Sequence, residues 1–495
     1  MSYARRVAYN TLAQIIGRVF TTITSLATVS ILNGILRPEG WGGYVAVTTY
    51  LGFFSVLADM GLNLLYLREL SRKPEEADEV TSRFLGFRLF TATVVLLIAA
   101  PLIGMLIPAY QPFSSAILLM AIGQFFLTMN QVCVTVVQAR LMMDRAMISD
   151  LVGRVAILAG TVYVGMQVAE ENRFLAAITV VVLGNALNMV VSWLFTRKLV
   201  RFRPRFLLQE WPGIFMQVLP IGAMAVLGMI HFKADSILLT LYRPEIEVGI
   251  YGNAYKVLEI IITLPAMFVG GLFPEMNQLI QRGSDGLHGL MQKAFDLLVF
   301  AAIPVVTGIV LFAPHIIAVL TRNYIPESAL SLRIVAFAMI PLFIGTLMAH
   351  ALLATEKQKQ LSIVELVAVI LNIGLNVYLI PKYSYYGAGS ATVITEVLTT
   401  VITTWLTIRV LGFYPRLRTV VPALVGAVCM AAMYFFIRKV GGDIWSTHYY
   451  DWSHAQQAGL LLLVIAVSGA AYVVPFFLFK QFPPVIQERL YARFK

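Results

Sequence analysis

The most constraining feature of the sequence is a series of long apolar runs that recurs along almost its whole length. A helix needs about 20 predominantly apolar residues to cross the hydrocarbon core of a bilayer. We interpret about fourteen runs as such helices, near residues 7–33, 41–66, 84–108, 113–138, 147–168, 174–197, 213–241, 248–273, 291–313, 328–353, 360–380, 386–410, 417–437 and 457–479. Only 13% of the residues are charged, about half the share in soluble domains. The chain is therefore predicted to be an all-α polytopic membrane protein.

The basic residues are distributed unevenly between alternate connections. With a cytoplasmic N-terminus, 24 Lys and Arg residues fall on the cytoplasmic side and seven on the other. This is the bias expected of a correct topology. It places both termini in the cytoplasm and explains the net charge of +11 without a nucleic-acid partner. The first run is long and lacks a cleavage site, so we expect it to be retained. The predicted location is the cell membrane.

Two short motifs occur twice, in the same order. The motif RPEGWGGY at 37–44 is matched by RPEIEVGIY at 243–251, each before an apolar run. Likewise, WLFTR at 193–197 with Pro204-Arg205 is matched by WLTIR at 405–409 with Pro415-Arg416. Each repeat would hold six helices, so both would have the same orientation in the membrane.

The repeats predict three parts of the chain: a six-helix lobe at 1–206, a second at 207–412, and two further helices with a cytoplasmic tail at 413–495. Two pseudo-symmetric six-helix bundles of this kind are expected to enclose a central cavity.

Several ionisable residues lie within the apolar runs, where a charge costs about 2.5–3.5 kcal/mol at the helix centre. We expect those far from a helix end to line a water-accessible cavity. The basic candidates are Arg18, Lys233, Lys256 and Arg333, and the possible charge partners or ion-coupling residues are Asp59, His231, Asp235 and Glu259. Lys256 and Glu259 are also spaced to neutralise each other on one helix. Arg88 and Glu365 lie nearer a helix end, and we expect them to extend to the membrane surface.

Motifs for catalysis are absent. The sequence contains no G-x-x-x-x-G-K-[ST] loop and no H-E-x-x-H motif, and no connection is long enough to form a catalytic domain. Cys133 and Cys429 both lie in apolar runs. We therefore expect no enzymatic activity, no cofactor and no metal site.

Several segments together resemble one family of transporters. They are LADMGLN at 57–63, Asp235, VGIYGNAYKVLE at 248–259, Phe273-Pro-Glu275 and YGAGSA at 386–391. In this order they resemble the polysaccharide and O-antigen flippases of the multidrug/oligosaccharidyl-lipid/polysaccharide exporter superfamily. The resemblance covers the whole chain.

The resemblance implies a flippase that moves undecaprenyl-pyrophosphate-linked oligosaccharide to the outer leaflet by alternating access. It implies that Arg18, Lys233, Lys256 and Arg333 meet the pyrophosphate. Expected partners are this substrate, membrane lipids, an H⁺ or Na⁺ counter-ion, and a polysaccharide polymerase or export machinery. The alternatives are a cation-coupled multidrug antiporter of the same superfamily and a peptidoglycan-precursor lipid flippase.

Overall fold

The structure, a computed structural model, describes residues 3–282, 286–322, 325–442, 452–479 and 482–483. For residues 3–16, 18, 19 and 455 it describes the backbone but not the side chains. Within these ranges every regular element is a helix. The predicted all-α class is thus confirmed. The chain forms two compact units, residues 1–249 and 250–495.

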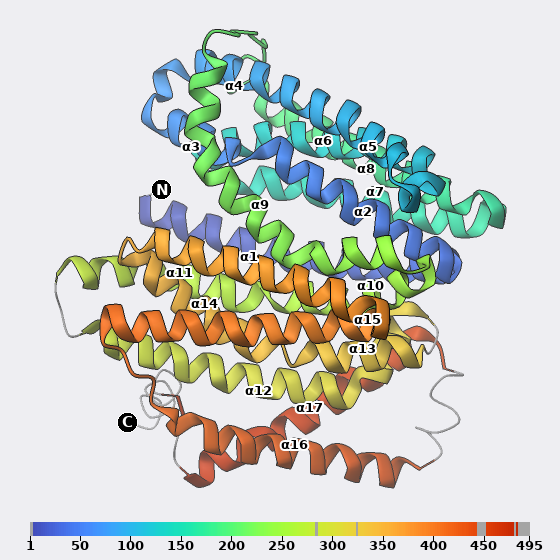
Figure 1. Cartoon of the computed structure of the whole chain (residues 1–495), viewed down its shortest axis with the longest axis vertical. Helices are drawn as coiled ribbons and strands as arrows, with labels where there is room; N and C mark the ends of the chain where they lie inside the picture. Colours follow the sequence, from blue (N-terminus) through green and yellow to red (C-terminus); the bar gives the residue numbers. More distant parts are fainter. Residues whose placement is uncertain (1–2, 283–285, 323–324, 443–451, 480–481, 484–495) are drawn as a thin grey trace. The chain divides into compact units, whose positions relative to one another are not determined.

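The first unit packs its helices largely side by side (Figure 1). Its α-helices are α1 (Tyr3–Ile35), α2 (Arg37–Asp59), α3 (Leu62–Arg72), α4 (Ala77–Ala92), α5 (Ala100–Leu106), α6 (Ser114–Ala139), α7 (Met143–Gln167), α8 (Arg173–Thr196) and α9 (Trp211–Tyr242). Short helical turns join several of them, namely η1 (Pro74–Glu76), η2 (Thr93–Ala99), η3 (Pro108–Phe113) and η4 (Glu170–Asn172). In this unit α8 packs between α6 and α7, and α9 packs on α2 and α3.

The second unit begins within α10 (Glu245–Ile261). Its other elements are α11 (Thr263–Gln281), α12 (Gly286–Thr321), α13 (Pro326–Ala336), α14 (Met339–Ala354), α15 (Gln358–Leu411), η5 (Leu417–Thr419), α16 (Val420–Gly441) and α17 (His454–Phe479). The last two helices pack on each other and on α12. Aromatic pairs join them, with 4.9 Å between the ring centroids of Phe312 and Tyr434 and 4.8 Å between those of Phe300 and Phe476.

Helix α15 contains two of the predicted membrane spans. It has 54 residues, about 80 Å of helix at 1.5 Å per residue, whereas the hydrocarbon core is about 30 Å thick. Its backbone breaks at Ser384, where φ is 53°, between the spans predicted at 360–380 and 386–410. The described residues hold twelve helices long and apolar enough to span a membrane. Counting α15 twice and adding α1 gives about fourteen spans, as predicted.

The helix bounds follow the repeat predicted from the motifs. Two corresponding spans, Arg37–Arg72 and Glu245–Gln281, contain 36 and 37 residues. Both are broken, the first at Met60-Gly61 and the second at Ile262. This agreement supports the duplication. The predicted division into 1–206, 207–412 and 413–495 stays a prediction. The two compact units are a different division, which falls at residue 249 and places α9 in the first unit.

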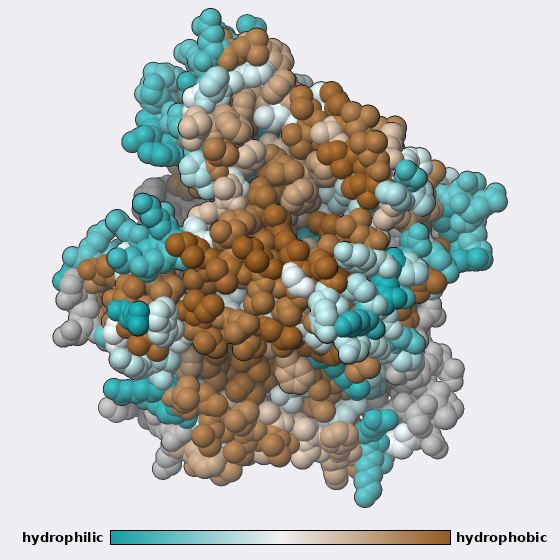
Figure 2. Space-filling model, viewed as in Figure 1, coloured by the Kyte–Doolittle hydropathy of each residue, from teal (hydrophilic) through white to brown (hydrophobic). Residues whose placement is uncertain are grey.

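The surface is that of a membrane protein. In Figure 2 hydrophobic residues cover the visible sides of the helices, and hydrophilic residues gather at helix ends. Large apolar side chains point outward, such as Leu106 and Met166, which are 78% and 76% exposed. Such exposure along whole helices is stable only against lipid.

Candidate functional site

Helix α9 carries three of the predicted site residues. His231 and Asp235 are buried, and their spacing of four residues places them on one helix face. Oδ1 of Asp235 accepts a hydrogen bond from the backbone N–H of Ser236 at 2.8 Å. Lys233, between them in sequence, is only half-buried. The helix thus presents Asp235 and His231 on one face and Lys233 on another.

Helix α10 carries an ion pair in the middle of a long apolar span. Nζ of Lys256 lies 3.0 Å from Oε2 of Glu259, and the two side chains remain 38% and 31% exposed. They stand one helical turn apart, so the pair forms without help from another helix. The predicted mutual neutralisation is confirmed. Neither side chain is fully buried, and the proposed contact of Lys256 with pyrophosphate stays a prediction.

Arg333, on α13, has a structural partner. Its Nε donates a hydrogen bond to the backbone carbonyl of Val310 at 3.0 Å. That carbonyl lies four residues before Pro314 in α12, and proline has no N–H to offer it. Arg333 therefore gives the Val310 carbonyl the hydrogen-bond donor that Pro314 cannot supply. Its predicted contact with pyrophosphate stays a prediction.

Arg88 does not extend to the membrane surface, so that prediction is wrong. Its side chain, on α4, is only 2% exposed. Nη1 donates to Oδ1 of Asp59 at 2.6 Å and Nη2 to Oδ1 of Asn63 at 2.9 Å. Asp59 and Asn63 flank the break between α2 and α3, where Gly61 also donates its N–H to Asp59 at 3.2 Å. Burial is tolerated because the guanidinium finds a carboxylate and an amide at the break.

The remaining candidates are placed as follows. Arg18 belongs to α1, but its side chain lies outside the described residues. Glu365 on α15, expected at the membrane surface, is half-buried. Arg154 on α7, a further basic residue within an apolar span, forms an ion pair with Asp150 at 3.0 Å. Among the residues that the structure describes, no cluster of His, Cys, Asp and Glu could hold a metal ion.

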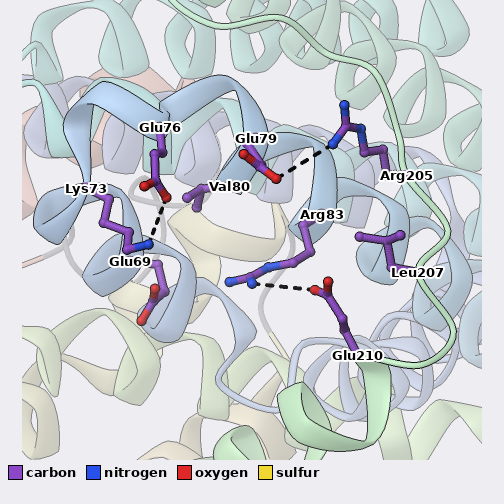
Figure 3. A pocket seen from close by; sticks show the side chains of 9 residues that line it. All are labelled: Glu69, Lys73, Glu76, Glu79, Val80, Arg83, Arg205, Leu207 and Glu210. Atoms are coloured by element: carbon purple, nitrogen blue, oxygen red, sulfur yellow. Dashed lines mark hydrogen bonds and ion pairs between the residues drawn. The ribbon is translucent and has the colours of Figure 1, made fainter.

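A charged pocket lies between the α3–α4 corner and the connection from α8 to α9. We call residues 197–210 the linker. The pocket has a volume of about 260 Å³ and is lined by Glu69, Lys73, Glu76, Glu79, Val80, Arg83, Arg205, Leu207 and Glu210. Figure 3 shows three ion pairs among these residues. Two of them join the linker to α4: Arg83 to Glu210 at 3.5 Å and Arg205 to Glu79 at 3.7 Å.

Backbone contacts also attach the linker to α4. The N–H of Arg205 donates to the carbonyl of Ser82 at 3.0 Å, and the N–H of Arg201 to Oδ1 of Asp78 at 2.8 Å. At Gly86 the backbones of α4 and the linker lie so close that a Cβ on residue 86 would collide with the carbonyl of Arg205. The linker is therefore part of the first unit's packing and fixes the point where α9 begins.

Sequence reasoning missed this attachment. The signal was present as complementary charge: the segment 75–79 carries four acids, and the segment 197–205 carries five basic residues. Both segments were predicted to lie on the same side of the membrane, but hydropathy does not say which connections touch.

The fold and its apolar spans define a polytopic membrane protein. The chain belongs to the family described as "Polysaccharide biosynthesis protein", whose model matches residues 4–280. This confirms the resemblance noted in the sequence.

Two curated relatives are named as flippases, both from Haloferax volcanii. The "Probable flippase AglR" is 25% identical over 240 residues, which cover 47% of this chain and 50% of the relative. The "Probable low-salt glycan biosynthesis flippase Agl15" is 21% identical over 176 residues, 35% of this chain and 37% of the relative. The matches thus span half or less of these relatives' lengths.

Solved structures show the same fold. A lipid II flippase, MurJ, in an inward closed conformation, superposes with a TM-score of 0.72, covering 95% of this chain and 100% of its own at 12% identity. An inward-facing transporter of the multidrug resistance MATE family gives a TM-score of 0.64, covering 79% of this chain and 94% of its own at 14% identity. At these identities the likeness concerns the fold alone.

Proposed function

We propose that the protein is a flippase that moves an oligosaccharide linked to undecaprenyl pyrophosphate from the cytoplasmic to the outer leaflet of the cell membrane. In this proposal both termini are cytoplasmic, transport proceeds by alternating access, and no bond is made or broken. The observation that carries it is that the two curated relatives are named flippases, one of them for glycan biosynthesis.

The α10 ion pair supports an anionic cargo. Lys256 lies in a 37-residue apolar span, yet over a third of its side chain is exposed. A pyrophosphate that reached it would replace Glu259 as the partner of the ammonium group. Charge-assisted bonds of this kind contribute about 1.5–3 kcal/mol. Lys233 and Arg18 are the further proposed contacts, and Arg333 is the weakest candidate because it already bonds Val310.

The membrane potential can assist such a cargo. Outward movement of negative charge, with the inside negative, gains about 2.3 kcal/mol per charge per 100 mV. An H⁺ or Na⁺ counter-ion would act through Asp235 or Glu259 rather than Asp59, because Asp59 already bonds the buried Arg88. Flipping rates measured at imposed potentials and ion gradients distinguish these sources of energy.

The test is substrate flipping in vesicles reconstituted with the full chain. Lys256→Ala should slow flipping of lipid-linked oligosaccharide about tenfold or more, while unfolding in detergent changes by under about 1 kcal/mol. Lys73→Ala is the matched control, since Lys73 and Glu76 form the same i, i+3 pair at 2.8 Å in the connection between the spans predicted at 41–66 and 84–108. Equal rates in wild type and Lys256→Ala would overturn the site.

The same assay separates the alternatives. A peptidoglycan-precursor flippase would move lipid II and leave the oligosaccharide lipid in place. A multidrug antiporter would exchange cationic drugs for H⁺ or Na⁺. Either result would overturn the proposed substrate while leaving the fold and family unchanged.

A further inference from the structure

The outer surface of the linker is basic and apolar, and it takes no part in the proposed transport site. Its basic residues are Arg197, Lys198, Arg201, Arg203 and Arg205. All five are exposed, and they follow directly after the membrane-spanning helix α8. A cluster of four to eight basic residues beside a membrane span is typical of a surface that attracts anionic lipids.

Three of these charges are not neutralised by neighbouring acids. Among the described residues, no carboxylate lies within ion-pair distance of Arg197, Lys198 or Arg203. The guanidinium of Arg197 lies over the ring of Trp193, 5.4 Å from its centroid, so an aromatic face rather than an acid accompanies it. The positive charges of these three side chains are therefore available to pair with an anionic ligand.

The other two charges are only loosely paired. Arg201 lies 3.7 Å from Asp78 and is 75% exposed, and Arg205 lies 3.7 Å from Glu79 and is 60% exposed. The Arg205–Glu79 pair borders the pocket, whose lining holds four glutamates against three basic residues. This acidic excess disfavours an anion in the pocket, whereas the outer surface of the linker has an excess of basic residues.

The linker backbone is held in place. Besides the bonds of Arg201 and Arg205 to α4, Nη2 of Arg140 donates to the carbonyl of Leu199 at 2.8 Å. A ligand that binds a fixed set of charges does not have to order the chain first, which lowers the entropic cost of binding.

Aromatic residues gather at the end of the linker. Trp211, the first residue of α9, packs against Phe90 with 4.6 Å between ring centroids and against Phe206 with 6.4 Å. Phe206 and Leu208 are 57% and 67% exposed. Tryptophan and other aromatic residues gather where hydrocarbon meets water. We therefore expect the basic side chains beside headgroups and the apolar ones beside the upper acyl chains.

We propose that the linker surface binds the headgroups of anionic phospholipids in the leaflet that it faces. This leaflet is the cytoplasmic one by the distribution of Lys and Arg, and the proposal is independent of the transported substrate. The bound lipid supplies phosphate oxygens to Arg197, Lys198 and Arg203, while its acyl chains lie against Phe206 and Leu208. The site anchors the start of α9 to the membrane surface.

The test is native mass spectrometry of the full chain in detergent, titrated with phosphatidylglycerol or phosphatidylcholine. Wild type should retain phosphatidylglycerol in preference. The triple variant Arg197→Gln, Lys198→Gln and Arg203→Gln should weaken that binding about fivefold for each charge removed. The matched control is Arg282→Gln, Lys357→Gln and Lys359→Gln, which removes three exposed charges predicted on the same side. It should leave the binding at this site unchanged.

Three outcomes would overturn the proposal: equal loss in both triple variants, no preference over phosphatidylcholine in wild type, or a triple variant that loses only added undecaprenyl pyrophosphate. The last result would assign the surface to a polyprenyl lipid instead. Arg203→Gln alone keeps the test valid if the triple variant misfolds, because the Arg203 side chain makes no hydrogen bond or ion pair with the residues that the structure describes. It should still weaken phosphatidylglycerol binding about fivefold, and no weakening would count against the site.

Discussion

Each repeat is followed by a polar connection, residues 197–210 in the first unit and 412–419 in the second, and the two are attached differently. Both carry a Pro-Arg pair whose arginine N–H is bonded to a helix: Arg205 to Ser82 on α4, and Arg416 to the side chain of Gln292 on α12 at 2.8 Å. The backbone attachment is therefore common to both units.

The side chains make the difference. In the second unit Asp296 is fully buried and accepts hydrogen bonds from Arg418 at 2.9 Å, Thr419 at 2.6 Å and Gln292 at 3.0 Å. In the first unit the ion pairs between the linker and α4 that border the pocket, Arg83–Glu210 and Arg205–Glu79, are 3.5–3.7 Å long, and their side chains are 33–70% exposed. The two repeats therefore share the position at which the connection attaches. The strength of the attachment is expected to depend on whether the carboxylate that accepts the hydrogen bonds is buried.

The largest effect is expected at Asp296. Asp296→Asn removes the buried charge and turns an amide group toward Arg418 or Thr419, so the second unit should lose about 2–4 kcal/mol. The matched change in the first unit is Glu79→Gln, since Glu79 is 70% exposed. It should cost under about 0.5 kcal/mol. Denaturant unfolding in detergent measures both, and equal losses would contradict the comparison.

A smaller effect is expected where the linker touches α4 most closely. Gly86→Ala forces the carbonyl of Arg205 away, at a cost of about 1–3 kcal/mol, and should expose the linker to trypsin. Gly213→Ala is the control, because a Cβ there meets no atom within 4 Å. Limited proteolysis followed by peptide mapping reads the change directly. If both variants are cut at the wild-type rate, the linker is not held at Gly86.

The smallest effect is expected at the exposed pair beside the pocket. The hydrogen bond to Glu76 raises the pKa of Lys73 above its ordinary value. A raised lysine pKa adds stability below the unfolded pKa of about 10.4, and this is lost as the pH rises through the folded value. Glu76→Gln should move the pH midpoint of Lys73 acylation down, with unfolding at pH 7 nearly unchanged. A midpoint that stays in place would show that the pair does not form.

Much of the fold could be predicted because hydropathy and charge bias are properties of single segments. The spans at 360–380 and 386–410 were separable in sequence although α15 runs through both. The Lys256–Glu259 pair was likewise predictable, since its two members lie one turn apart on one helix.

The errors concern contacts between segments. Arg88 was expected at the membrane surface from its distance to the helix end. Its actual position depends on Asp59 and Asn63, which come from the break between α2 and α3. The attachment of the linker depends in the same way on α4 lying beside it. Neither the position of Arg88 nor the attachment of the linker can be predicted from a single helix, because each depends on which helix faces pack together.

Polar connections between membrane helices are the usual places for inserting an epitope tag or a protease site, since free loops accept extra residues at little entropic cost. The linker lacks that freedom. Its backbone is bonded at Leu199, Arg201 and Arg205, so an insertion between these residues would pull at least one bond out of register. For engineering, we therefore expect an insertion between residues 199 and 205 to cost stability, whereas an insertion in a loop without such bonds would not.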